Sequence, residues 1–177
     1  METVTFVDGF GRAVQVKKDG VVTSASKGNS AKDENVMIVS GRKMYDAFGR
    51  VAKAFYPTTE GTGSKSTFSK SFDNVSPTVT VYDVLDRATS VTLPDNSTTT
   101  TAYTVDNGSH ALVTTVTDAL HNVQATHTNG SGKTLKTIQK SGPDGEITTS
   151  FEYDGIQRLV RVTDTEGNVT TSTYDMG

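Results

Sequence analysis

The sequence contains no cysteine and no tryptophan, and only 7% of its residues are aromatic. Without cysteine, the chain can form neither a disulfide framework nor a thiolate metal site. Hydrophobic residues make up 33% of the chain, which is too little for a thick sandwich core but suits a thin sheet with one face in water. Because threonine and valine favour strands and are abundant here, the composition predicts an all-β fold.

A strong charge of one sign and long apolar runs are also missing. The formal charge is −3, and lysine and arginine are scattered along the chain. Nucleic-acid binding needs a clustered basic surface, so the charge pattern argues against it. No apolar stretch approaches the roughly 20 residues of a membrane span, and the residues after Met1 lack the basic and apolar regions of a signal peptide. We therefore expect no membrane span.

What the sequence does contain is a short phrase that recurs. It reads aromatic residue, Asp, a few loop residues that often include Gly, and then Arg before an apolar alternation. A last copy is interrupted at Gly177, so we expect a segment of a longer chain. The Asp residues are separated by roughly 36 or about 20 residues, and a period in this range indicates an array of stacked small units. The residues that define these anchors are Phe6, Asp8, Arg12, Tyr45, Asp46, Gly49, Arg50, Tyr82, Asp83, Arg87, Tyr153, Asp154, Arg158, Tyr174 and Asp175.

A second internal match sets the phase of the repeat. Residues 164–175 align without gaps on residues 118–129, which places Asn129 where Asp175 stands. Asn129 is therefore interpreted as a degenerate copy of the anchor, and the unit is about 20 to 25 residues long. The wider spacing then spans two units.

Turn signals separate the strand patterns, for example Asp106-Asn107-Gly108 and Pro143-Asp144-Gly145. Such residues supply the backbone conformations that tight turns need, so each unit is predicted to be one β-hairpin, with no convincing helix. The whole of 1–177 is expected to be one repeat region. Two polar segments, near 25–35 and 57–66, are least like the repeats and are expected to be long loops.

The residue types of the anchor point to a structural role. An Asp carboxylate can accept hydrogen bonds from backbone N–H groups just beyond it, and Gly11 and Gly49 permit a left-handed backbone. The Arg is expected to bridge to a neighbouring hairpin. The tyrosine rings are expected to pack against adjacent hairpins, with their hydroxyls at the wet edge.

The phrase resembles the YD repeat of the Rhs family, which includes bacterial Rhs proteins, the B and C components of insecticidal toxin complexes, wall-associated proteins and teneurins. Residues 45–50 match the Tyr-Asp-x-x-Gly-Arg signature fully; the copies at Tyr82 and Tyr153 lack its Gly, and the first copy has Phe6 in place of Tyr. The resemblance implies an array of stacked antiparallel hairpins that forms a curved, spiralling sheet, part of a hollow β-shell. It also implies a secreted or cell-surface parent whose shell encloses, carries or displays a C-terminal toxin.

Three other functions were weighed on the residues. The recurrent Asp residues occupy equivalent turns and need not converge as a catalytic pair, and His110, His121 and His127 lack further metal ligands; no catalytic residue, cofactor or metal is expected. A carbohydrate-binding or adhesive module stays open if the tyrosines are exposed beside Asp and Arg. The partners expected are flanking repeats, an enclosed toxin domain or glycans, and raw strand edges could pair with copies of the same fragment.

Overall fold

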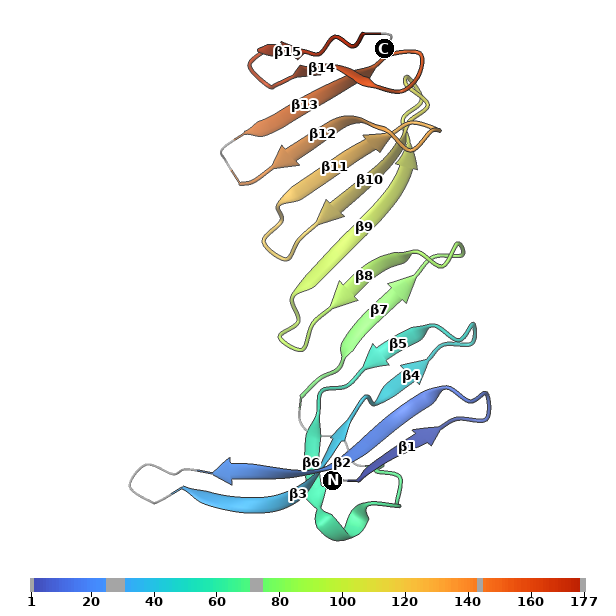
Figure 1. Cartoon of the computed structure of the whole chain (residues 1–177), viewed down its shortest axis with the longest axis vertical. Helices are drawn as coiled ribbons and strands as arrows, with labels where there is room; N and C mark the ends of the chain where they lie inside the picture. The colour runs from blue at the N-terminus through green and yellow to red at the C-terminus, as the bar shows by residue number, and fades with distance from the viewer. Residues whose placement is uncertain (1, 25–30, 71–74, 143–144, 176–177) are drawn as a thin grey trace. The chain divides into compact units, whose positions relative to one another are not determined.

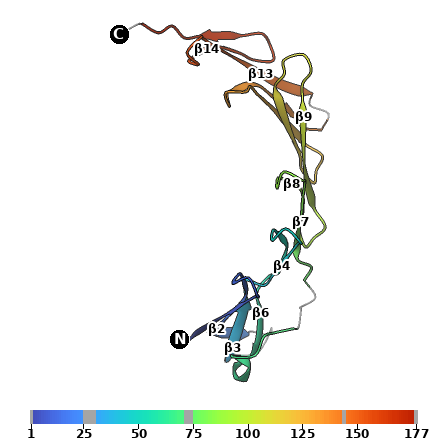
Figure 2. The same cartoon turned by 90° about the vertical axis from the view of Figure 1, so that its right-hand side faces the viewer.

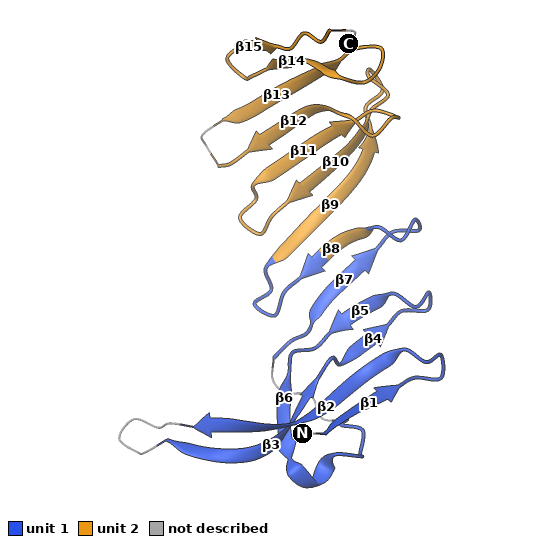
Figure 3. Cartoon of the chain, viewed as in Figure 1, with its two compact units in different colours: residues 1–87, 91–97 blue, residues 88–90, 98–177 orange. Residues whose placement is uncertain are grey.

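The computed structural model describes residues 2–24, 31–70, 75–142 and 145–175 (Figure 1). These residues are almost entirely β-structure, and their one helical element is the short 3-10 turn η1, Thr62–Ser64. The prediction of an all-β array of antiparallel hairpins is confirmed. The chain divides into two compact units, which comprise residues 1–87 with 91–97 and residues 88–90 with 98–177 (Figure 3).

Unit 1 begins with a four-stranded antiparallel sheet in the order β1 (Thr3–Val7), β2 (Ala13–Ser24), β3 (Lys32–Ser40) and β6 (Thr58–Gly61). Met37 and Val39 on β3 are fully buried and form its core. Two polar side chains of β2 are buried as well. Gln15 exchanges two hydrogen bonds with the backbone of Ser69, at 3.1 and 2.8 Å, and Lys17 Nζ pairs with Glu60 Oε2 at 2.6 Å. The Lys17–Glu60 pair joins β2 to β6, and the Gln15–Ser69 bonds hold the segment after β6 against the sheet.

Unit 1 also contains the hairpin β4 (Lys43–Tyr45) and β5 (Val51–Ala54), and β5 pairs antiparallel with β7 (Thr78–Tyr82). The next strand, β8 (Ala88–Thr92), is divided between the units. The hairpin loops 8–12, 46–50 and 83–87 are five-residue anchors, so the repeated phrase determines where β1, β4 and β7 turn into the next strand of their hairpins.

Unit 2 is a sheet in which strand order follows chain order. Each strand is antiparallel to the next, and the edge-on view of Figure 2 shows them as a single layer. The arrangement is the simplest one that short local hairpins can make. Its strands are β9 (Thr98–Val105), β10 (Leu112–Thr117), β11 (Val123–Thr128), β12 (Thr134–Lys140), β13 (Glu146–Tyr153), β14 (Leu159–Thr163) and β15 (Val169–Thr171).

The pleat gives the two faces of β10–β13 different chemistry, because neighbouring residues point to opposite sides. On one face, in-register rows run across the four strands: Thr114, Thr126, Thr137 and Thr149, and beside them Val116, Gln124, Gln139 and Ile147. That side, here called the uncharged face, carries no acidic or basic residue on these strands. The opposite, charged face carries Lys136, Lys140, Glu146 and Glu152 on β12 and β13 and the buried Val113 and Ala125 on β10 and β11.

The two segments expected to be polar loops contain short stretches of strand. Residues 32–35 belong to β3 and pair with the end of β2; residues 25–30 of that segment lie outside the described residues. Residues 58–61 form β6 on β3, and 62–64 form η1. The prediction was wrong there because a ribbon or edge strand exposes both faces, so backbone pairing can form it without an apolar side.

Candidate functional site

The anchor loops have a common geometry, seen clearly at Asp46. Its N–H donates to the carbonyl of Arg50 at 2.9 Å, and the Gly49 N–H donates back to the Asp46 carbonyl at 3.0 Å. Asp46 Oδ1 accepts the N–H groups of Phe48 and Arg50, both at 2.9 Å, while Oδ2 accepts Arg50 Nε at 2.7 Å. With Gly49 at φ 83°, this is a turn closed by a left-handed bulge residue.

The same contacts recur in the loops that begin at Asp8, Asp83 and Asp154. The fourth position of the loop has a positive φ every time. Glycine fills it in two loops, whereas Asp86 and Gln157 fill it in the others, at φ 61° and 67°. The Asp carboxylate holds the turn in all four loops, including the two that depart from the signature at the glycine.

The structure shows two further loops of this kind, which lack both the aromatic residue and the arginine of the repeated phrase. In the loops 118–122 and 164–168, an asparagine replaces the arginine, and its Nδ2 donates to the Asp Oδ2 at 2.8 Å. A signal was available, namely Asp followed four residues later by a side-chain N–H donor. The interpretation of Asn129 as a degenerate anchor is confirmed, because its Oδ1 accepts the N–H groups of Ser131 and Lys133 at 3.0 and 2.9 Å.

Each anchor tyrosine donates its hydroxyl to the preceding hairpin. The acceptor is always the backbone carbonyl of the residue that follows the arginine or lysine of an earlier anchor loop. The four bonds are Tyr45 to Ala13 at 3.0 Å, Tyr82 to Val51 at 3.2 Å, Tyr153 to Thr134 at 3.0 Å and Tyr174 to Leu159 at 2.8 Å.

The cation of that earlier loop lies over the same tyrosine ring, where it interacts with the negative face of the ring. The distances to the ring centroid are 4.1 Å for Arg12 on Tyr45, 4.8 Å for Arg50 on Tyr82, 5.8 Å for Lys133 on Tyr153 and 4.6 Å for Arg158 on Tyr174. We call this pair of contacts, hydroxyl to carbonyl and cation to ring, the tyrosine clasp. It links each of these hairpins to the one before it.

The clasp differs in detail from the sequence expectation. The hydroxyls bond to backbone carbonyls, and the rings of Tyr45, Tyr82 and Tyr153 are half-buried. Arg50 does reach the neighbouring hairpin, where its Nη1 donates to the Asp83 carbonyl and to Asp86 Oδ1, both at 2.8 Å. Its Nε, however, is held by Asp46 of its own loop, and this intraloop pair is what the four arginine loops share.

The loop carboxylates are held in their ionised form. At Asp46, desolvation alone would raise the pKa, but the hydrogen bonds from the Arg50 N–H, the Arg50 side chain and the Phe48 N–H outweigh it and lower the pKa. At Asp154 the N–H and side chain of Arg158 are the main causes of a lowered pKa. Hydrogen bonds to the charged form always act in this direction. The carboxylates are therefore poised to hold turns and are poor proton donors.

Two predicted anchor residues stand outside this pattern. Phe6 has no hydroxyl, and its ring packs edge-on against Phe68 with centroids 5.6 Å apart. Asp175 is exposed at the end of the described residues, and Tyr174 just before it makes the last clasp.

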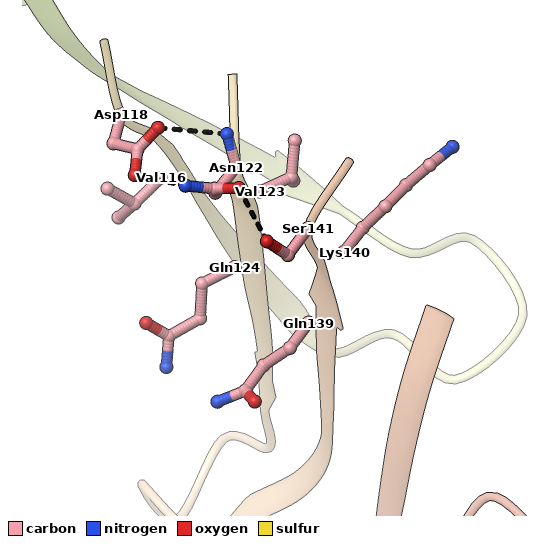
Figure 4. Close-up of a pocket in the computed structure, with 8 residues that line it drawn as sticks. All are labelled: Val116, Asp118, Asn122, Val123, Gln124, Gln139, Lys140 and Ser141. Carbon is pink, nitrogen blue, oxygen red and sulfur yellow. Dashed lines mark hydrogen bonds between the residues drawn. The ribbon is translucent and has the colours of Figure 1, made fainter. Parts of the chain in front are cut away.

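A shallow cavity of about 280 Å³ lies beside the loop 118–122 on unit 2 (Figure 4). Its polar groups bond mainly to one another: Asn122 donates to Asp118 at 2.8 Å and accepts the Ser141 hydroxyl at 2.8 Å. The amides of Gln124 and Gln139 lie side by side nearby. Both oxygens of the Asp118 carboxylate accept hydrogen bonds from Asn122, four residues on, so the arrangement is one of turn stabilisation.

The three histidines do not meet at one point. His110 and His121 occupy left-handed turn positions, and His127 Nδ1 lies 3.9 Å from Asp106 Oδ2. Within residues 2–24, 31–70, 75–142 and 145–175, no group of three metal-binding side chains of the His, Cys, Asp or Glu type comes together. The same residues include no helix with the length and apolar character needed to cross a membrane.

Comparison with known proteins gives a match at the level of structure. No protein-family model matches the sequence, and no curated protein sequence does. The fold is similar to the crystal structure of TcdB2-TccC3, with a TM-score of 0.63 and 18% identity over 92% of this chain. It is similar to TcdB2-TccC3-TEV with a TM-score of 0.64 and 19% identity, also over 92%. The chain spans 9% of the length of each of these proteins. At this level of identity, the structural similarity shows that the chain shares its fold with part of these proteins.

Proposed function

We propose that this chain is a wall segment of an Rhs-type shell, whose role is to build the sheet that encloses, carries or displays an effector. The observation that supports this most strongly is the tyrosine clasp. Four contacts of one kind, at Tyr45, Tyr82, Tyr153 and Tyr174, each join a hairpin to an earlier one, and the anchor carboxylates hold the turns from which the clasp cations extend. These contacts are structural: they join hairpins, and the side chains that make them are bonded to one another.

The likeness of the fold to TcdB2-TccC3, over nearly all of this chain and a small part of that one, supports the same role. A segment that matches 9% of a large chain and repeats one hairpin is what a piece of a repetitive wall should look like. We infer that the parent is secreted or displayed at the cell surface and that the flanking partners are further repeats of the same chain.

The different chemistry of the two faces of unit 2 indicates which face of the sheet points into the proposed shell. An uncharged face of threonine, glutamine, valine and isoleucine opposite a face with lysine and glutamate is expected where one side meets protein and the other meets water. We infer that the uncharged face of β10–β13 lines the enclosed space.

The glycan-binding alternative rested on exposed tyrosines. In the clasp, the ring face of each tyrosine lies against a cation and its hydroxyl donates to a carbonyl. These contacts occupy the hydroxyl and one ring face of each tyrosine, so the tyrosine ladder does not favour that function.

Adjacent residues of β12 allow a matched test of enclosure. Lys136 lies on the charged face and Thr137 on the uncharged face, and the chain has no cysteine of its own. Lys136→Cys and Thr137→Cys would be placed separately in the natural full-length protein, with any cysteines elsewhere replaced, and treated with a maleimide on a large polyethylene glycol. We expect rapid modification of the Lys136→Cys protein and protection of the Thr137→Cys protein until denaturant is added. Equal modification of both would contradict enclosure.

A further inference from the structure

The tips of the anchor loops in unit 1 carry large apolar side chains that face water. Phe10 and Phe48 occupy the same position in successive loops and are 86% and 81% exposed, and Val84 at the next tip is 96% exposed. Turn geometry does not require an apolar residue at these positions, where small polar residues are the usual choice. A row of exposed apolar residues of this kind marks an interaction surface.

Two open grooves run between these tips. The first, of about 410 Å³, lies between Phe10 and Phe48 and has the Arg12 guanidinium in its lining. The second, of about 510 Å³, lies between Phe48 and Val84 and includes Tyr82, Asp83 and Asp86. In each groove an arginine lies over the ring of its own tip, at 5.1 Å for Arg12 on Phe10 and 5.0 Å for Arg50 on Phe48.

The charge of the second groove determines which sign of charge a partner should carry. The Arg50 guanidinium is shared by two carboxylates, Asp46 at 2.7 Å and Asp86 at 2.8 Å, while Asp83 is neutralised by Arg87 at 2.7 Å. Two carboxylates on one cation leave one negative charge in excess, and the Asp86 side chain is 75% exposed. An apolar wall beside an accessible carboxylate favours a partner that offers an apolar side chain together with a cation.

The spacing of the grooves selects the shape of the partner. The loops 46–50 and 83–87 are two strands apart, which is about 9.5 Å, because β5 and β7 pair directly. Loop 8–12 belongs to the other sheet of the unit, and the same tyrosine clasp, through Arg12 and Tyr45, sets it against loop 46–50. Side chains on one face of an extended strand repeat about every 6.8 Å, so they would not match the spacing of the loops. In an α-helix, residues seven apart are separated by about 10.5 Å, so one side chain could enter each groove.

We propose that the loop tips of unit 1 form a docking surface for a basic amphipathic helix of a partner polypeptide. The helix places an apolar side chain between Phe10 and Phe48. A lysine or arginine seven residues away enters the second groove, with its stem on Phe48 and Val84 and its charge beside Asp86. This surface is separate from the uncharged face of unit 2 and adds an outside partner to the proposed wall.

The probe is a fluorescein-labelled synthetic peptide of leucine and lysine with an amphipathic helical pattern, and its counterpart has glutamate in place of every lysine. Fluorescence anisotropy on the whole chain should show saturable binding of the leucine–lysine peptide, weakened by salt, and binding of the glutamate peptide at least tenfold weaker. Phe48→Ser should weaken binding about tenfold, and Phe48→Leu should keep most of it. Asp86→Asn, which still tolerates the left-handed backbone, should weaken it severalfold.

Ile156→Ser is the matched control, because Ile156 is the exposed tip of an equivalent loop in unit 2. It should leave binding unchanged, and urea midpoints should show that every variant is folded. Equal binding of the two peptides, or equal effects of Phe48→Ser and Ile156→Ser, would overturn the proposal. So would concentration-dependent sedimentation of the chain alone that Phe48→Ser abolishes, because the occupant would then be a second copy.

Discussion

The tyrosine clasp makes a prediction that separates it from simple packing of tyrosines at a wet edge. The perturbation is Tyr45→Phe, which keeps the ring beneath Arg12 but removes the hydroxyl that donates to the Ala13 carbonyl at 3.0 Å. A hydroxyl that only faces water contributes nothing when removed. A hydroxyl in the clasp contributes one intramolecular hydrogen bond.

The magnitude follows from the surroundings. A neutral hydrogen bond contributes about 1 kcal/mol net, and because Ala13 is exposed, water can reach its carbonyl in the variant and the loss stays near that value. Tyr45→Leu also removes the ring under the guanidinium, which lies 4.1 Å from its centroid. A cation–ring contact at a partly exposed site adds about 1 kcal/mol, so this variant should lose about 2 kcal/mol in total.

Urea unfolding followed by far-ultraviolet circular dichroism would measure both losses, provided that the slope of free energy against urea is unchanged. Tyr56→Phe, at a tyrosine that is 43% exposed and takes part in none of the four clasps, supplies a comparison for the general effect of removing a hydroxyl. A Tyr45→Phe variant as stable as the parent chain would refute the hydroxyl contact, and a Tyr45→Leu variant no less stable than Tyr45→Phe would refute the cation contact.

Three further predictions concern the turns and the buried ion pair. Because hydrogen bonds lower the pKa of Asp46 and its counterparts below 3.8, the stability that they contribute is fully present above about pH 4 and should be lost as the pH falls through their folded values; circular dichroism should show a smaller acid loss in Asp46→Asn. In urea unfolding, Gly11→Ala should lower the free energy of unfolding by about 1 to 2 kcal/mol, because alanine is strained in a left-handed backbone. Gly49→Ala should lower it further, because the new Cβ would also lie 2.9 Å from a guanidinium nitrogen of Arg12. Equal losses would contradict a rigid clasp. Lys17→Met should lose about 3 kcal/mol by leaving Glu60 unpaired, and adding Glu60→Met should restore part of it; a double variant less stable than Lys17→Met would contradict the pairing.

The local parts of this fold could be predicted from sequence. Strand alternation, turn residues and the repeated Asp are all short-range signals, and they predicted hairpins and the carboxylate-held turn. Internal alignment went further and found the degenerate anchor at Asn129. These succeed because each hairpin closes within a few residues of its own loop.

The contacts that join hairpins could not be read in the same way. The acceptor for Tyr82 is a backbone carbonyl at Val51, 31 residues earlier, and a carbonyl has no sequence signature. The burial of Gln15 and Lys17 was equally hidden, because their partners Ser69 and Glu60 lie 54 and 43 residues away. Polar residues on a strand indicate a wet face unless such distant partners are known.

The most direct test of the central claim is an electron cryomicroscopy structure of the natural full-length protein that contains these residues. The account predicts that unit 2 continues into further paired hairpins and that the row Thr114, Thr126, Thr137 and Thr149 faces a closed chamber, with Lys136 and Lys140 on the outside. A structure in which both faces of β10–β13 stand open to solvent would contradict the account.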